Sequence, residues 1–210
     1  MKILLHLIIF FSIATVFSQE STVIKYAESK IIKKEMLTSV PAAMKDFVLA
    51  QIQAMKSTST LTFFENTHFY KLSSTKKNVN KKGDINSDSG GTYKDAKGTI
   101  TARDELISKN TLQNTYQIYE DNKLISKPLE RVSWKISKNT KKILNYNCYK
   151  AVAVYNKKPL TVYFTTEIKG KASPNKYPFI NGVILEYYDG GRTGIATDVS
   201  FNQPNIKKFF

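Results

Sequence analysis

The sequence predicts an α+β fold that is mostly antiparallel β, in which a curved, half-barrel-like meander sheet packs on one N-terminal helix. Short apolar and β-branched runs recur at close intervals from residue 99 onward, and turn residues separate them. Strands in series that are joined by short turns favour an antiparallel meander. One stretch near the N-terminus instead repeats its apolar residues at helical spacing.

The first expected elements are a strand and a helix. Apolar and polar residues alternate within residues 21–34, which predicts an opening strand. Ser39 is a suitable N-cap for the helix that follows, and Pro41 suits its first turn. The apolar residues of this helix share one face, so we expect that face to pack against the core. They are Met44, Phe47, Val48, Ile52 and Met55.

The rest of the chain is expected to form strands, with one long interruption. Residues 61–64 and 68–72 are rich in β-branched and aromatic side chains and predict a strand pair. Lysine, asparagine, serine, aspartate and glycine dominate residues 73–97, which predicts a flexible loop. Further strands are expected at residues 114–119, 132–136, 149–155, 160–165, 183–188 and 195–201.

The first eighteen residues have the features of a cleavable signal peptide. Lys2 supplies a positive charge, residues 3–17 are apolar, and cleavage is expected between Ser18 and Gln19. A membrane-spanning helix needs about 20 apolar residues, so the alternative of an uncleaved anchor is disfavoured. Residues 1–18 are therefore predicted to be a signal peptide and residues 19–210 a single β-rich domain, with no transmembrane segment after cleavage.

The chain is strongly basic, with a formal net charge of +15 that comes mainly from lysine. Proteins that recognise nucleic acid favour arginine for bidentate contacts to bases and phosphates. This sequence has only three arginines, Arg103, Arg131 and Arg192. The lysines are scattered in pairs along the chain, which is typical of a solvated surface. We therefore expect no specific nucleic-acid partner.

Composition also argues against several kinds of active site. His68 is the only histidine and Cys148 the only cysteine beyond the signal peptide, too few for a zinc site. No serine has nucleophile-elbow glycines, so neither a metal, a cofactor nor a catalytic residue is expected. Cys148 is expected to be buried and inert, with an exposed interchain thiol as the alternative. Residues 190–194 lie between two strand-like runs and predict a hairpin turn instead of a phosphate loop.

The C-terminal third resembles the GLPGLI family, a group of exported proteins of Gram-negative bacteria without an established activity. The pieces that carry the resemblance are Trp134, residues 143–146, Cys148, Lys150, Ala151, residues 163–168, Gly170, Pro174, Phe179 and residues 181–186. The naming motif is altered here to Ile180-Asn181-Gly182-Val183-Ile184. Asn181-Gly182 still forms a strong tight-turn pair. The resemblance implies a secreted or periplasmic protein of the cell envelope.

The function expected from this reading is that of a noncatalytic envelope protein. Its sheet and helix would form an apolar groove for a lipid-like or peptide ligand, or for an envelope protein partner. We expect this architecture by analogy with the half-barrel of lipoprotein carriers. The residues expected at the groove are Trp134, Lys150, Tyr163, Phe179, Ile184, Leu185 and Glu186.

The alternative is a carboxylate-dependent hydrolase of envelope or extracellular polymers. Glu167 and Glu186 would have to face each other across strands, with Asp189 near a turn. Glycosidases hold two carboxyl groups roughly 5 to 9 Å apart. The sequence does not fix that distance.

Overall fold

The computed structural model describes residues 21–73, 75–86, 92–102, 105–120 and 123–201. The predicted signal peptide lies outside these residues. The elements are β1 (Thr22–Lys30), η1 (Lys34–Met36), α1 (Ala42–Ala54), β2 (Lys56–Phe64), β3 (Thr67–Leu72), β4 (Thr75–Asn86), β5 (Thr92–Ala102), β6 (Glu105–Asn110), β7 (Thr115–Glu120), β8 (Lys123–Pro128), β9 (Lys135–Ile143), β10 (Tyr146–Tyr155), β11 (Lys158–Thr165), β12 (Val183–Tyr188) and β13 (Arg192–Ser200).

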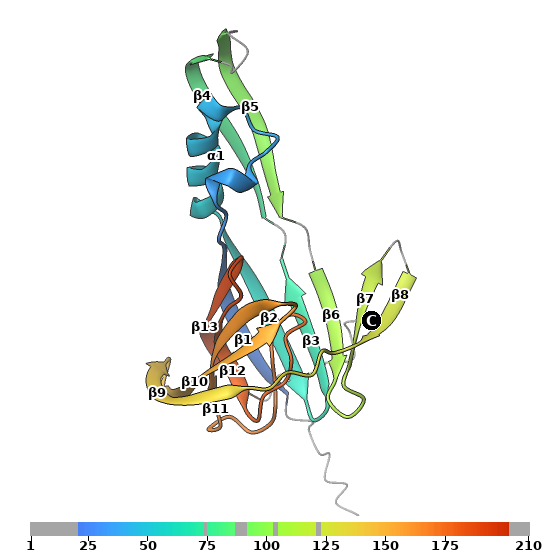
Figure 1. The fold of residues 1–210 in the computed structure, drawn as a ribbon. Coiled ribbons are helices and arrows are strands. Elements are labelled where there is room, and N and C mark those ends of the chain that lie inside the picture. Colours follow the sequence, from blue (N-terminus) through green and yellow to red (C-terminus); the bar gives the residue numbers. More distant parts are fainter. Residues whose placement is uncertain (1–20, 74, 87–91, 103–104, 121–122, 202–210) are drawn as a thin grey trace, which may run out of the picture.

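Within the described residues, eleven strands form one open, curved antiparallel sheet in the order β8-β7-β6-β3-β2-β1-β13-β12-β11-β10-β9 (Figure 1). Most neighbours in the sheet are also neighbours in the chain, as in a meander. β1 pairs with its chain neighbour β2 and also with β13, and this second pairing joins the two strands that are farthest apart in the sequence. The first and last strands therefore meet in the middle of the sheet. This confirms the predicted fold class, mostly antiparallel β with one helix near the N-terminus.

The flexible loop predicted over residues 73–97 is wrong for its described part. β4 and β5 pair with each other as a separate antiparallel hairpin inserted between β3 and β6. The hairpin projects beyond the ends of β3 and β6 (Figure 1). Its polar composition resembles that of a loop, but backbone pairing between two strands does not require apolar side chains. Composition therefore gave no sign of this hairpin.

The helix has the predicted position but not the predicted role. α1 begins directly after Pro41, and none of its residues is buried. It lies alongside the β4–β5 hairpin and contacts β4 (Figure 1). The expected core-facing stripe is therefore wrong, because α1 lies mainly against β4 of the projecting hairpin and touches the main sheet only at β1.

The hydrophobic core lies within the curve of the large sheet. It joins fully buried side chains from both halves, such as Leu61 on β2, Ile107 on β6 and Val162 on β11. The turn between β10 and β11 is tight, because Asn156 and Lys157 both take positive φ angles of 48° and 62°. This conformation suits the twist of the flanking strands. The turn brings Lys158 to the rim of the pocket described below.

No helix in the described part of the chain is long and apolar enough to cross a membrane.

Candidate functional site: a polar pocket above a buried ion cluster

A polar pocket of about 430 Å³ opens between turns at one end of the central strands of the curved sheet. The turns β10–β11 and β12–β13 contribute to it, as do the end of β1 and the segment between β11 and β12. Its lining residues are Lys30, Tyr155, Asn156, Lys158, Asn175, Asp189, Gly191 and Arg192. Its volume falls in the range of small-molecule sites, about 300–1,000 Å³.

Asp189 is fixed by the β12–β13 turn. Its Oδ1 accepts hydrogen bonds from the backbone N–H groups of Gly191 at 2.9 Å and Arg192 at 2.7 Å. Its Oδ2 accepts one from the Tyr177 hydroxyl at 2.7 Å. Gly190 takes a φ of +85°, which an L side chain rarely adopts. The segment is a hairpin turn, and it presents a carboxylate to the pocket.

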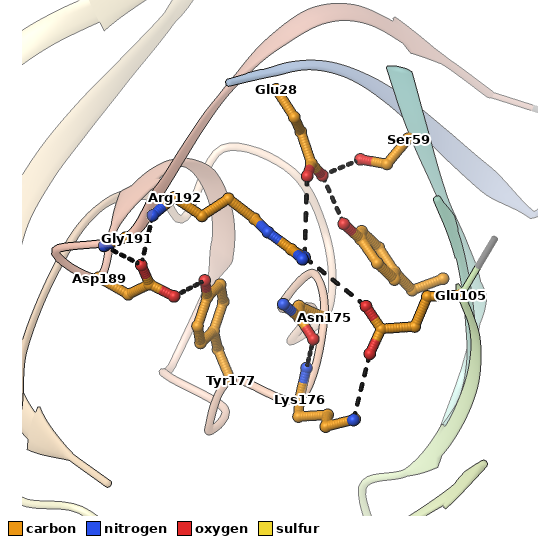
Figure 2. Close-up of polar contacts among 10 residues, drawn as sticks. Glu28, Ser59, Glu105, Asn175, Lys176, Tyr177, Asp189, Gly191 and Arg192 are labelled. Atoms are coloured by element: carbon orange, nitrogen blue, oxygen red, sulfur yellow. Dashed lines mark hydrogen bonds and ion pairs between the residues drawn. The ribbon is translucent and has the colours of Figure 1, made fainter. Parts of the chain in front are cut away.

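Arg192 extends from this turn into an ion cluster behind the pocket (Figure 2). Its Nη1 lies 3.9 Å from Oε2 of Glu28 and 3.6 Å from Oε2 of Glu105. Glu105 also pairs with Lys176, whose Nζ is 3.1 Å from Oε1. One guanidinium therefore bridges β1 and β6, and a lysine ties the segment before β12 to the same cluster.

Glu28 is the deepest member of the cluster, with 2% of its surface exposed. Its Oε1 accepts short hydrogen bonds from the hydroxyls of Ser59 and Tyr70. Burial raises the pKa of Tyr70, and the Glu28 charge raises it further. Tyr70 therefore stays protonated and remains a hydrogen-bond donor to the buried carboxylate.

The charge on Arg192 is secured by its neighbours. Burial alone lowers the pKa of Arg192, but the charges of neighbours that include the Glu28 and Glu105 carboxylates outweigh that effect, so its pKa lies above its ordinary value. Three polar atoms here are buried without a hydrogen-bond partner among the described residues: Glu28 Oε2, Arg192 Nη1 and the Tyr187 hydroxyl.

The segment between β11 and β12 carries Asn175, Lys176 and Tyr177, and a buried lysine anchors it. Lys109 on β6 is 2% exposed, and its Nζ donates to the Ser173 carbonyl and, at 2.7 Å, to the Ser173 hydroxyl. Ser173 in turn donates to the Tyr177 carbonyl at 2.7 Å. Burial lowers the pKa of Lys109 well below its ordinary value. These bonds hold the pocket residues of this segment against the sheet.

Next to Lys109, His68 is fully buried, and its ring is uncharged at neutral pH. His68 pairs with Lys109 across β3 and β6, and its ring stacks on Phe63 with centroids 5.7 Å apart. Burial, and next the charge of Lys109, lower the pKa of His68 from 6.5 to about 3. Neither ring nitrogen has a hydrogen-bond partner in the described part of the structure. His68 is a core residue, and it is not placed to act as a catalytic base in the pocket.

This histidine predicts an acid-dependent loss of stability. Because the unfolded chain binds a proton below pH 6.5 and the folded chain does not until about pH 3, stability falls as pH drops through that window. At pH 5 the loss should be about 2 kcal/mol relative to pH 7.5. Lys109, whose pKa is also lowered, gives a pH dependence of the same sign. We therefore expect His68→Phe to reduce the loss by about this amount, and not to remove all pH dependence, when urea unfolding is measured across pH 4.5–7.5. If the free energy of unfolding of His68→Phe depends on pH as steeply as that of the wild-type protein, the assignment is wrong. A difference in stability between the two proteins that is the same at every pH reports only a change in packing.

The seven residues expected to form an apolar groove do not line this pocket. Ile184 and Leu185 are fully buried in the core. Trp134 is partly buried, and its indole N–H donates to the Phe179 carbonyl at 3.0 Å. Asn181 is exposed, and the Gly182 N–H donates to the Ile180 carbonyl at 2.8 Å in a tight turn just before β12.

The polar members of that set are engaged elsewhere. Glu186 pairs with Lys141, whose Nζ also lies 4.0 Å from the centroid of the Tyr163 ring. Lys150 is half-buried on β10, opposite Tyr163 on β11. Glu167 is exposed and accepts a hydrogen bond from the Asn147 side chain at 2.9 Å. Glu167 and Glu186 are therefore held by separate partners, although both of their charges act on the Cys148 thiol. The carboxylates that converge on the Arg192 guanidinium are Glu28 and Glu105.

Cys148 does not line the pocket. Cys148 is buried, and burial raises the pKa of its thiol to about 11. Within the described residues, no group of three or more histidine, cysteine, aspartate and glutamate side chains is placed to hold a metal ion.

Sequence reasoning missed most of the cluster, because its members are far apart in the chain. Glu28, Glu105 and Arg192 come from three strands that only the sheet brings together. The one local signal was the turn that begins at Asp189, where a carboxylate precedes two glycines and an arginine.

Residues 55–203 match the family model described as the N-glycanase peptide, N-terminal domain. Since the match spans more than half of the chain, the protein belongs to this family. Comparison with curated proteins found no match.

Among solved structures, PNGF-II in its P21 crystal form is similar in fold, with a TM-score of 0.54 and 16% identity. The alignment covers 90% of this chain and 30% of that one. The C2 form of PNGF-II gives a TM-score of 0.46 at 16% identity, covering 89% of this chain and 28% of that one. This chain therefore spans about 30% of the length of the structure it matches.

The family match corrects two expectations. The resemblance to GLPGLI proteins is wrong, because the matched region contains the whole stretch from Trp134 to Glu186 on which it rested. The expected noncatalytic envelope protein with an apolar groove is also wrong. A match to an N-glycanase domain favours the hydrolase alternative.

Proposed function

We propose that this protein works in the processing of N-linked glycans, and that the polar pocket above the Arg192 cluster engages the glycan. Membership of the N-glycanase N-terminal domain family carries the proposal. The signal peptide predicted over residues 1–18 supports a place of action outside the cytoplasm. There the chain would meet glycoproteins or polymers of the cell surface.

The chemistry of the pocket supports this assignment. Glycans present many hydroxyl groups, and the pocket offers the Asp189 carboxylate, the Arg192 guanidinium and two asparagine amides. Asp189 already accepts three hydrogen bonds from the protein, which fix its orientation and leave about one of its roughly four lone-pair sites for a ligand. Tyr155 adds an aromatic ring at the wall, and its hydroxyl donates to the Lys176 carbonyl at 3.1 Å.

Asp189→Asn tests the site. Asparagine has nearly the same shape and keeps an oxygen for the backbone N–H groups of Gly191 and Arg192, so the turn should persist. Loss of the charged acceptor should lower affinity for an N-glycopeptide about tenfold or more, measured by calorimetry. Release of the glycan is followed in the same samples by mass spectrometry, and we expect any release to fall with binding.

Asp198→Asn is the matched control, because Asp198 pairs with Lys25 at the surface of β13 and does not line the pocket. The same peptide without its glycan controls for peptide binding. If glycosylated and bare peptide bind equally and no glycan is released, the proposed function is wrong.

A further inference from the structure

The charges that line the pocket are unbalanced. Three of its lining residues are cationic, namely Lys30, Lys158 and Arg192, and only Asp189 is anionic. Lys30 and Arg192 are direct cross-strand partners on β1 and β13. Like charges placed directly opposite each other across strands are destabilising. The fold therefore keeps an unfavourable pair of cations at this wall.

The cations differ in how far the protein neutralises them. Arg192 faces two carboxylates, Glu28 and Glu105, in the cluster behind the pocket. In contrast, neither Lys30 nor Lys158 makes an ion pair with any residue that the structure describes. Both are exposed at the rim. The Asp189 carboxylate is held by its own turn and by Tyr177, so it does not pair with either lysine.

The uncompensated charge at the pocket mouth is therefore positive. The two lysines come from different elements, β1 and the start of β11, and approach the same pocket from either side of the β12–β13 turn. A ligand with an anionic group at its end would meet both ammonium groups, while its hydroxyls would face the amides of Asn156 and Asn175. A neutral glycan would leave the lysines unpaired.

We propose that this pocket selects acidic glycans, in which a terminal sugar carries a carboxylate or a phosphate group, with Lys30 and Lys158 as its specificity-determining residues. The inference rests on the proposed function, since it names the substrate class of the same site. Lysine binds such groups as a compact point charge, which suits either kind of anion.

The test compares three N-glycopeptides with the same peptide: one with terminal sialic acids, the same one after sialidase treatment, and one with mannose 6-phosphate termini. Calorimetry with the full chain should show tighter binding of an acidic form than of the neutral form. Lys30→Gln and Lys158→Gln should each weaken acidic binding about two- to fivefold, as expected for partly exposed charge pairs. The double variant should bind acidic and neutral forms alike.

Lys157→Gln is the matched control, because Lys157 is exposed in the same turn and does not line the pocket. Raising NaCl from 50 to 500 mM should reduce the preference of the wild-type protein, since salt screens exposed charges. A preference for the sialylated or for the phosphorylated form identifies the anionic group. Equal binding of all three forms by the wild-type protein overturns this inference alone, whereas binding of none overturns the proposed function with it.

Discussion

Replacing Gly194 by alanine should destabilise the protein by about 3 kcal/mol, near the upper end for added volume in a packed core. A Cβ at this position would lie 2.4 Å from Cε1 and 2.5 Å from Cζ of the Tyr187 ring. Gly194 and Tyr187 are direct partners on β13 and β12, so the ring lies across the glycine. Tyr187 is 1% exposed and packs against Tyr177, with ring centroids 4.9 Å apart. The ring therefore has no free space into which to move.

Gly191→Ala is the matched control for Gly194→Ala. Gly191 lies three residues earlier, and its nearest neighbour to an added Cβ is Asp189 Oδ1 at 3.8 Å, an ordinary contact. We expect this variant to change the free energy of unfolding by less than about 0.5 kcal/mol. Urea denaturation of both variants measures the difference. Equal stability of the two would mean that Tyr187 does not cover Gly194 as described.

Removing the Arg192 guanidinium should have a comparable effect, for an electrostatic reason. Arg192→Met keeps much of the side-chain length but leaves Glu28, 2% exposed, without its nearby cation. Breaking a buried ion pair by removing one partner costs about 3–5 kcal/mol. We therefore expect a loss of roughly 3 kcal/mol in urea unfolding at pH 7, because Glu28 keeps its hydrogen bonds from Ser59 and Tyr70.

A second substitution separates the charge from the packing. In the Arg192→Met background, Glu28→Gln removes the unpaired charge while keeping an acceptor for the two hydroxyls. It should recover part of the lost stability, although in the wild-type protein Glu28→Gln should be destabilising, because it removes the anionic partner of Arg192. Arg131→Met, at an exposed arginine, controls for the loss of one positive charge. If Glu28→Gln lowers stability equally in both backgrounds, the two side chains are not coupled.

Most of the sheet was predictable because its strands carry the alternation that a half-buried strand requires. The predicted strands at residues 149–155, 160–165 and 183–188 correspond to β10, β11 and β12. Tight turns mark their ends, as at Asn156, through residues that tolerate positive φ. These are local signals, and they act over only a few residues.

The β4–β5 hairpin and the helix were misjudged because their stability depends on partners that the local pattern does not reveal. The backbone hydrogen bonds of β4 and β5 satisfy each other with little need for an apolar face. The apolar residues of α1 recur at helical spacing, but this spacing does not indicate which part of the protein the helix packs against. The groove was misjudged for a similar reason, since Ile184 and Leu185 could have faced either a cavity or a core.

The sequence by itself determined the antiparallel β class, the helix position, the turn at Asp189 and the scarcity of histidine and cysteine. Only the tertiary structure decided which carboxylates converge. Glu28 and Arg192 stand at opposite ends of the described chain and meet because β1 pairs with β13. Glu105 joins them through the curve of the sheet. Side-chain alternation is a property of each strand alone, whereas an ion cluster depends on strand order and curvature, which arise from packing the whole chain around one core.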